Sequence, residues 1–306
     1  MSGKKALLKT YRNGNYFVRL YEDGTKVRIL PAAEFQPKFP ENIDLKITSY
    51  CDGDCPMCHE NSNRNGVPAD LSLAFFSTLH TGMELAIGGG NPLTHPKLED
   101  FLSRMKKQGI VCNITVRQDH LFRRLDFVQS LIDRKLIYGI GISYQSKTEE
   151  LLSFCEKNPN AVLHLILGIH GRQVLEDLSD HSLKILLLGY KRFGRGNDFY
   201  SSKVEKKTDE VKEIFSEIQN HFQVISLDNE AMRLLDIEHF VSEEDFRKHF
   251  MGDEGQFTMY IDAVKKEFAV NSITEEKRRF PLTDDIRTMF HQVRYQYENH
   301  DQKKCL

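Results

Sequence analysis

The sequence lacks any long apolar run. None of its stretches approaches the roughly 20 uninterrupted apolar residues that a membrane-spanning helix requires. The N-terminal segment MSGKKALLKTYRNGNY has early lysines but only a three-residue apolar run, which is too short for the core of a signal peptide. We therefore expect a cytoplasmic chain with no membrane association.

The sequence also has no excess of either charge. Its 42 Lys and Arg residues and 44 Asp and Glu residues give a net charge of −2, and the two signs are interspersed. A broad basic surface for nucleic acid is therefore not expected. The 306 residues, 40% hydrophobic and 28% charged, have an ordinary globular composition and are enough for one large domain or two small ones.

Cysteines are few, and half of the six lie within eight residues: Cys51, Cys55 and Cys58 are clustered, whereas Cys112, Cys155 and Cys305 are far apart. The disulfide framework of a secreted protein would distribute cysteines in pairs over a smaller chain. Clustered cysteines in a reducing compartment instead favour a metal site.

Short apolar runs alternate with helix-like segments over residues 43–235, and the runs are 43–48, 84–88, 110–116, 136–143, 161–169, 183–190 and 222–227. This alternation predicts parallel strands joined by right-handed crossovers. We expect an α/β fold with a full or partial (β/α) barrel over 43–235, and a doubly wound sheet is the competing fold.

Two flanking regions depart from this alternation. Residues 1–42 contain two alternating runs around an Asp-Gly turn, which predicts an N-terminal β-hairpin over 16–30. Residues 236–306 predict a helix, a second hairpin over 256–272 and a closing helix, which together form an α+β extension packed on the barrel.

The segment YCDGDCPMCHE (50–60) begins where the first apolar run ends. In parallel α/β folds, functional groups gather at the carboxyl ends of strands. Three thiolates are one fewer than an ordinary iron–sulfur cluster uses, so a [4Fe–4S] cluster on Cys51, Cys55 and Cys58 would leave one iron open to an outside ligand. The alternative is a zinc-stabilised binding module in which His59 completes a Cys3His site.

A second motif, LAIGGGNPLTHP (85–96), follows the next apolar run and contains Gly89, Gly90, Asn91 and Pro92. Glycines let the main chain approach a ligand closely and adopt a positive φ. This motif and the cysteine loop would meet at the carboxyl ends of two neighbouring strands.

Together, the C-x3-C-x2-C loop and the Gly-Gly-Asn-Pro segment resemble the radical S-adenosylmethionine (radical SAM) superfamily. The resemblance implies a [4Fe–4S] cluster on Cys51, Cys55 and Cys58 whose open iron binds the methionine moiety of S-adenosylmethionine. One electron then cleaves this co-substrate to a 5′-deoxyadenosyl radical. Residues 89–92 would hold the methionyl amino group, with Asn91 where the family has an acid. An electron donor such as flavodoxin or ferredoxin is also implied.

Other polar residues follow later runs. By the same resemblance, Ser143 would contact the methionine carboxylate or the ribose, and Tyr144 is a candidate catalytic residue beside it. Lys191 lies in a cationic, glycine-rich loop that could bind a carboxylate or phosphate. Cys112 could point into the barrel and donate hydrogen to a substrate radical, or it could pack as a small buried hydrophobe.

The substrate is the least determined part of the sequence-based interpretation. Edge strands of the hairpins at 16–30 and 256–272 could pair with an extended peptide, which favours a peptide or protein substrate over other small molecules. A nucleoside or nucleotide is the alternative, supported by the cations Lys191, Arg192 and Arg195.

Overall fold

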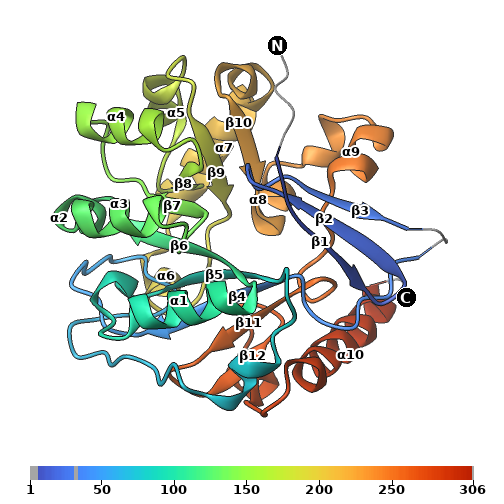
Figure 1. Cartoon of the computed structure of the whole chain (residues 1–306). Coiled ribbons are helices and arrows are strands. Elements are labelled where there is room, and N and C mark those ends of the chain that lie inside the picture. Colours follow the sequence, from blue (N-terminus) through green and yellow to red (C-terminus); the bar gives the residue numbers. More distant parts are fainter. Residues whose placement is uncertain (1–5, 31–33, 305–306) are drawn as a thin grey trace.

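The chain is built around one ten-stranded sheet, seen in a computed structural model that describes residues 6–30 and 34–304, so that Cys305 lies outside the described residues (Figure 1). The sheet order is β10-β9-β8-β7-β6-β5-β4-β11-β12-β13. Strands β4 to β10 are all parallel and neighbour one another in chain order, as the alternation of apolar runs and helices predicted. Their bounds are β4 (Asn42–Thr48), β5 (Glu84–Gly89), β6 (Val111–Arg117), β7 (Gly139–Ser143), β8 (Ala161–Ile166), β9 (Lys184–Leu188) and β10 (Val224–Leu227).

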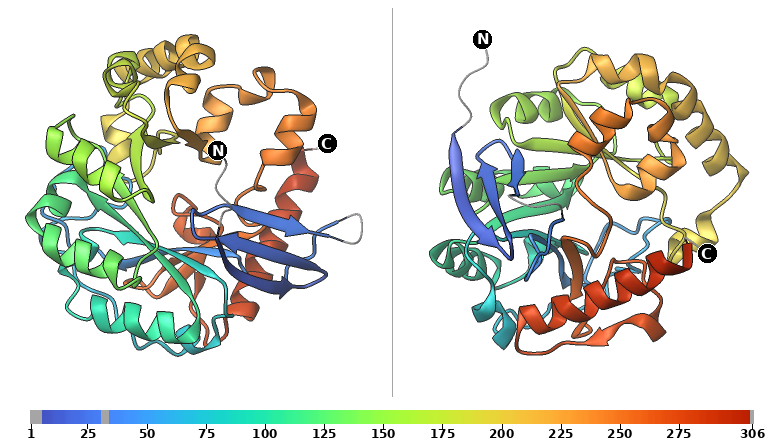
Figure 2. Two further views of the ribbon diagram at one scale, coloured as in Figure 1. Left: turned by 45° about the horizontal axis from the view of Figure 1, so that its top comes forward. Right: turned by 90° about the vertical axis from the view of Figure 1, so that its right-hand side faces the viewer.

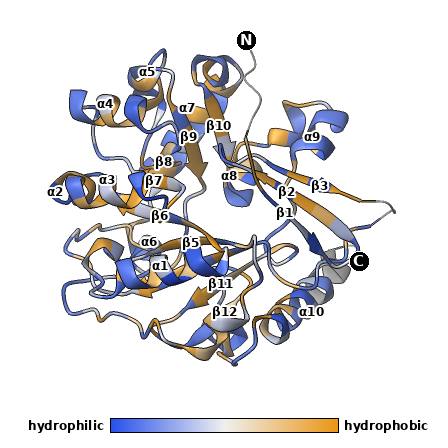
Figure 3. Cartoon of the chain, in the orientation of Figure 1, coloured by the Kyte–Doolittle hydropathy of each residue, from blue (hydrophilic) through white to orange (hydrophobic). Residues whose placement is uncertain are grey.

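Helices cover the convex face of this sheet because each strand buries alternate side chains against them (Figure 1). Ile43, Ile47, Leu85 and Ile87 are fully buried in that layer. The helices between and after these strands are α1 (Leu98–Gln108), α2 (Gln118–Arg123), α3 (Leu125–Asp133), α4 (Glu149–Lys157), α5 (Arg172–Leu178), α6 (Arg195–Phe199), α7 (Ser202–Ile218) and α8 (Asn229–Leu234). Of these, α6 lies against the cysteine loop and α8 lines a cavity, and neither belongs to the cover of the convex face. The outer faces of the covering helices are hydrophilic and their sheet-facing sides hydrophobic (Figure 3).

The opposite, concave face of the sheet carries polar side chains among small and apolar ones. It lines a cavity of about 570 Å³ with side chains that include Asn113, Thr115, His164 and Ser226. Within the described residues the sheet does not close, because β10 and β13 remain its two edges. The α/β fold with a partial barrel is therefore confirmed, and the full barrel is not formed.

A separate three-stranded antiparallel sheet, β1 (Leu7–Asn13), β2 (Tyr16–Tyr21) and β3 (Lys26–Ile29), confirms the predicted N-terminal hairpin and adds a strand that the sequence pattern did not reveal. Lys26 pairs with Glu84 at 2.6 Å, and Arg28 pairs with Glu41 at 2.8 Å. These carboxylates lie at the amino ends of β5 and β4. The small sheet (blue in Figure 2) is thus attached at the end of the barrel opposite to the cysteine loop.

The C-terminal region contains the expected helices α9 (Glu243–His249) and α10 (Ile286–Lys304), and the expected hairpin of β11 (Thr258–Asp262) and β12 (Glu267–Ala269). The hairpin is not free to receive a peptide strand, however. Strand β11 pairs in parallel with β4, and β12 pairs with β13 (Phe280–Pro281). The prediction that residues 256–272 offer an edge strand is therefore wrong, because both strands already have neighbours on both sides. No helix of the described chain combines the length and apolar character needed to cross a membrane.

Candidate functional site at the carboxyl end of β4

The cysteine loop leaves the carboxyl end of β4 and is fixed by its own backbone. The N–H of Cys51 donates to Asn63 O at 2.9 Å, and that of Cys58 donates to Cys55 O at 3.2 Å. All three thiols are partly buried and free of disulfides. Burial raises the pKa of the Cys51 thiol, the Gly53 N–H lowers it, and the charges of Cys55 and Cys58 raise it again. The three sulfurs therefore lie within electrostatic reach of one another.

Two arginines from distant strand ends hold this loop. Arg117, the last residue of β6, donates to Gly53 O and lies 3.5 Å from Cys55 Sγ, while Asp119 fixes its guanidinium at 2.6 Å. Arg195, at the start of α6, donates to Cys55 O at 3.1 Å and to Ser62 O at 2.9 Å. Arg117 therefore lies beside a thiol that would carry negative charge in a metal site, whereas Arg195 holds the loop through its carbonyl oxygens. The sequence interpretation missed Arg117, although its position at a strand end was a usable signal.

Asp52, next to Cys51, is held from helix α2. Its carboxylate lies 2.9 Å from His120 Nε2 and 2.6 Å from Arg123 Nη1. The hydrogen bond from Arg123, against a smaller effect of burial, lowers the pKa of Asp52, and His120 adds to the lowering. Asp52 is therefore ionised and anchors the first part of the loop.

The distances between possible metal-ligand atoms bear on whether the three cysteines hold a single zinc ion. A tetrahedral zinc with Zn–S bonds of about 2.3 Å brings its sulfurs to about 3.8 Å from one another. In the described part of the chain, the one group of three metal-ligand side chains whose donor atoms lie within 4.8 Å is Cys51, Asp52 and His120, not the three cysteines. The three thiols therefore do not have the close mutual spacing of sulfurs on one tetrahedral zinc.

His59 does not complete a zinc site with these cysteines. Its Nε2 lies 3.2 Å from Ser272 Oγ and 3.6 Å from Glu60 Oε1, inside the barrel. Burial and the nearby charges of Lys191 and Lys46 hold the pKa of His59 well below its usual value, so the ring is neutral. The imidazole is thus engaged by the barrel interior and not by the three thiols.

Glu60 anchors the far end of the loop in the barrel. It pairs with Lys46 of β4 at 2.7 Å and accepts a hydrogen bond from Tyr260 at 3.0 Å. Lys46 also contacts Asp262 at 3.1 Å. Burial lowers the pKa of Lys46, but the two carboxylates outweigh it and raise the pKa overall. This buried ion cluster ties the loop to β4 and β11.

The glycine segment after β5 packs directly on the cysteine loop. Gly89 has φ +109°, and a Cβ on Gly90 would lie 2.0 Å from Tyr50 O. The Asn91 N–H donates to the same Tyr50 carbonyl at 2.7 Å. Only glycine permits this approach, so the segment lies against the residue that precedes Cys51.

Asn91 presents an unused acceptor at this junction. Its side chain is 5% exposed, and no group of the described chain donates to its Oδ1. Its Nδ2 lies 3.4 Å from Asp52 Oδ1. A buried carbonyl oxygen without a donor is costly, which makes this atom a natural acceptor for an ammonium group of a ligand. The chain's residues therefore fit S-adenosylmethionine at this place.

Ser143 ends β7 on the concave face, directly across from His164 of β8. Burial lowers the pKa of His164 to about 4, so its ring is neutral at physiological pH. Tyr144 is 9% exposed, and its ring packs edge-on against His170 at 5.6 Å. Ser143 therefore lies at the carboxyl end of β7, opposite Arg117 of β6, and Tyr144 packs on His170, so its catalytic role stays a prediction.

Cys112 does not point into the barrel. It shares a face of β6 with Ile114 and Val116, and all three are buried in the hydrophobic core. Burial raises the pKa of its thiol to about 12. Cys112 also lies near the amino end of β6, five residues before Arg117, which touches the cysteine loop. The expected hydrogen-donor orientation is thus wrong, because the strand's alternation directs this thiol toward the core.

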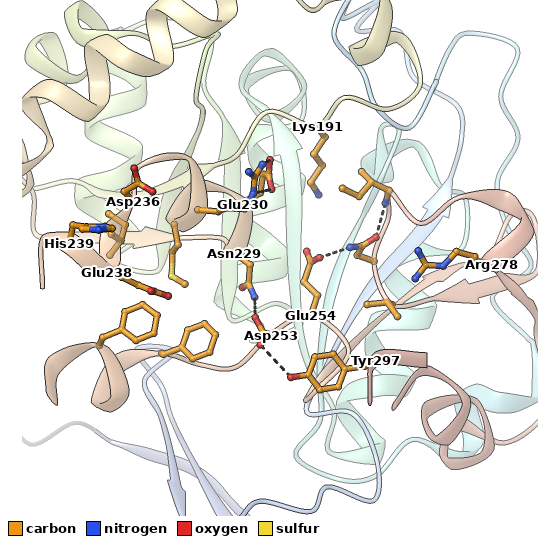
Figure 4. A pocket seen from close by; sticks show the side chains of 18 residues that line it. Lys191, Asn229, Glu230, Asp236, Glu238, His239, Asp253, Glu254, Arg278 and Tyr297 are labelled. Carbon is orange, nitrogen blue, oxygen red and sulfur yellow. Dashed lines mark hydrogen bonds and ion pairs between the residues drawn. The ribbon is translucent and has the colours of Figure 1, made fainter. Parts of the chain in front are cut away.

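Lys191, after β9, connects the loop to a large cavity. Its Nζ lies 3.1 Å from Ser272 Oγ, which in turn contacts His59. It also lines a cavity of about 780 Å³ between helix α8 and the C-terminal region (Figure 4). The neighbouring cation Arg192 stacks over the Tyr200 ring at 4.0 Å.

Comparisons with known proteins bear on the fold. No protein-family model matches the chain, and no curated protein sequence matches it either. Among solved structures, SuiB of Streptococcus suis is similar, with a TM-score of 0.53 at 10% identity over 87% of this chain and 81% of that one.

Two further SuiB structures, bound to S-adenosylmethionine and to the precursor peptide SuiA, give TM-scores of 0.49 and 0.48, each at 13% identity. Each match covers 76% of this chain. This chain spans 58% and 59% of the length of those two chains. The match at a TM-score of 0.53 shows that the ten-stranded partial barrel has a fold similar to that of SuiB.

Proposed function

We propose that this chain is a radical SAM enzyme with a single [4Fe–4S] cluster. It reductively cleaves S-adenosylmethionine and abstracts hydrogen from a peptide or protein substrate. The observation that carries the proposal is the junction of the two motifs. The glycine segment lies against the cysteine loop with the Asn91 acceptor unused, while His59 is held elsewhere by Ser272 and Glu60.

Each residue of the site has a definable part in this proposal. When bound, the cluster on Cys51, Cys55 and Cys58 supplies the electron that cleaves S-adenosylmethionine to a 5′-deoxyadenosyl radical. Asn91 Oδ1 accepts a hydrogen bond from the methionyl ammonium, and glycines 89 and 90 let the backbone approach it. Ser143 faces the remaining polar part of the co-substrate. The polar barrel interior orients the reacting groups and limits access of water.

Electrons must reach the cluster from outside, and we expect a donor such as flavodoxin or ferredoxin in the cytoplasm. Arg64 and Arg123 flank the cysteine loop, and their side chains are 65% and 52% exposed. Arg64 pairs with Asp54 and Arg123 pairs with Asp52, so the expected donor rests on the family resemblance and not on unpaired surface charge.

The cations cited for a nucleotide substrate are already engaged. Arg195 binds Cys55 O and Ser62 O, Arg192 stacks on Tyr200, and Lys191 contacts Ser272. A phosphate would have to compete with these contacts. The large cavity beside Lys191 therefore supports a peptide substrate better than a nucleotide.

The proposal is tested by anaerobic reconstitution with iron and sulfide, followed by dithionite and S-adenosylmethionine. We expect about four irons per chain and formation of 5′-deoxyadenosine. Cys55→Ala should lose the product, whereas His59→Ala should keep both the iron and the product. One colourless zinc per chain that His59→Ala abolishes would overturn the proposal in favour of a zinc site.

A further inference from the structure

The cavity of about 780 Å³ occupies the side opening of the partial barrel (Figure 4). One wall comes from helices α8 and α9, and the other comes from Glu254, Asn271, Arg278 and Tyr297. Its volume lies in the range of about 300–1,000 Å³ typical of binding sites. The cavity is therefore large enough for a few residues of a peptide.

Carboxylates dominate the charged groups of this cavity. Asp253 accepts hydrogen bonds from Asn229 at 3.5 Å and from the Tyr297 hydroxyl at 3.3 Å, and Glu254 accepts one from Asn271 (Figure 4). All of these donors are neutral. Glu238 also lines the cavity.

The cavity's own cations do not balance these carboxylates. Arg233 is paired with Glu230, which leaves Lys191 and Arg278 as the other cations of the lining. Among the described residues of the lining, Lys191 and Arg278 are therefore the cations left to balance three carboxylates. Asp253 and Glu254 accept hydrogen bonds from neutral donors, and Glu238 has no charged partner within the described part of the chain. The lining has an excess of negative charge.

The interior of the cavity disfavours this excess negative charge. Burial raises the pKa of Glu254, the hydrogen bond from Asn271 and the charge of Lys191 oppose the rise, and the carboxylates of Asp228 and Asp44 add to it. Burial likewise raises the pKa of Asp44 and of Asp228. A cationic group entering the cavity would stabilise the ionised form of Glu254, which is the one of these three carboxyls that lines it.

Aromatic rings accompany the carboxylates. Phe246 of α9 and Phe250, the residue after that helix, both line the cavity and stack on each other with centroids 5.1 Å apart, and Tyr297 adds a third ring. A guanidinium or ammonium group is attracted to the faces of such rings as well as to carboxylates. Carboxylates and aromatic rings together select a cation on an apolar stem over an anion or a neutral polar group.

The cavity also leads to the cysteine loop. Lys191 lines its upper end in Figure 4 and contacts Ser272, which contacts His59, the neighbour of Cys58. A peptide whose side chain fills the cavity would therefore have its neighbouring residues close to the loop.

We infer that this cavity binds a lysine or arginine side chain of the substrate peptide and thereby positions an adjacent residue for hydrogen abstraction. The inference rests on the proposed function for its second half only. Binding of the cationic side chain itself needs neither cluster nor S-adenosylmethionine.

The test uses the full chain, with and without reconstituted iron, and two fluorescein-labelled heptapeptides, Ala-Gly-Ala-Arg-Ala-Gly-Ala and the same peptide with citrulline for arginine. Citrulline has nearly the shape of arginine but no charge. We expect fluorescence anisotropy to show at least about tenfold tighter binding of the arginine peptide, which corresponds to one charge-assisted contact of about 1.4 kcal/mol.

Two variants test whether the preference for the arginine peptide comes from Asp253 and Glu254. The double variant Asp253→Asn, Glu254→Gln should lose the preference for arginine. The control Asp236→Asn should keep it, because Asp236 lines the same cavity but is already paired with Lys212. Thermal melts will show whether each variant is folded, and Asp253→Asn alone serves if the double variant is not.

Two outcomes overturn the inference: equal binding of the two peptides, or no binding of either at millimolar concentration. If the preference holds but no 5′-deoxyadenosine forms, the cation site stands and the radical function fails. If 5′-deoxyadenosine forms but citrulline binds as well as arginine, the radical function stands and the cation site fails.

Discussion

Replacing Gly90 with alanine tests whether the glycine segment is packed against the cysteine loop. The new Cβ would lie 2.0 Å from Tyr50 O, 2.6 Å from Tyr50 C and 3.2 Å from Ser49 C. All three atoms are backbone, so no side chain can rotate away. The chain leading into Cys51 would have to move by about 1 Å to restore ordinary contact.

The cost of this movement can be approximated. Overpacking in a tight site costs about 1–3 kcal/mol. The displacement would also weaken the bonds from Gly90 N to Thr48 O and from Asn91 N to Tyr50 O, now 2.8 and 2.7 Å, for about 1 kcal/mol more. We therefore expect Gly90→Ala to destabilise the chain by about 2–4 kcal/mol.

Gly88→Ala is the matched control, two residues earlier and inside β5. A Cβ there meets no atom within 4 Å, and no positive φ opposes it. Its stability should equal or slightly exceed that of the unaltered chain, since alanine in a strand is favoured over glycine by about 0.5–1 kcal/mol.

The assay is urea unfolding of the iron-free chain, followed by circular dichroism, with iron content measured after reconstitution. Gly90→Ala should lose stability and bind less iron, while Gly88→Ala should do neither. If the free energies of unfolding of the two variants differ by less than about 0.5 kcal/mol and both bind equal iron, the glycine segment does not pack tightly on the loop.

Three further changes probe other parts of the structure. Lys46→Met leaves two buried carboxylates without their cation and should cost about 3–5 kcal/mol in urea unfolding; a loss below about 1 kcal/mol would contradict the ion cluster. Arg117→Gln removes a charged donor near Cys55 Sγ and should lower the cluster's reduction potential by roughly tens of millivolts in an EPR-monitored titration, whereas the exposed Arg64→Gln should leave it unchanged. His164 has a native pKa of about 4 against an ordinary 6.5, so the unfolded chain takes up its proton first, and its contribution to stability, present above pH 6.5, should fall by up to about 3 kcal/mol toward pH 4. His164→Gln should flatten that part of the pH profile of unfolding, and an unaltered profile would refute the buried neutral ring.

The alternation of apolar runs and amphipathic segments was sufficient to predict the parallel strands β4 to β10. Each of the seven apolar runs became a parallel strand, because buried strands need continuous apolar sequence and the intervening amphipathic segments must cover them. The position of the cysteine loop at the carboxyl end of β4 followed from the same pattern. The stop at Gly109, with φ +81°, also follows from residue chemistry.

Long-range pairing was not predictable from local sequence. Strand β11 lies beside β4 although more than 200 residues separate them, and no local signal specifies that neighbour. For Cys112, the alternative that it packs as a small buried hydrophobe is confirmed, because it alternates in phase with the buried Ile114 and Val116.

The arginine contacts illustrate a second limit. Arg195 was noted as a substrate-binding cation, yet it donates to Cys55 O, and Arg117 was not noted at all. An exposed basic residue and one that holds a functional loop look the same in sequence. The two kinds of arginine are distinguished only in the folded chain, where Arg117 and Arg195 contact the cysteine loop.

The central claim is that three thiols hold an iron–sulfur cube whose fourth iron is open to S-adenosylmethionine. It is tested most directly by EPR of the dithionite-reduced, reconstituted chain before and after S-adenosylmethionine is added. We predict that the added compound shifts the signal of the cluster in the unaltered chain and in His59→Ala alike. A signal that S-adenosylmethionine leaves unchanged, or that responds only once His59 is removed, would contradict the claim.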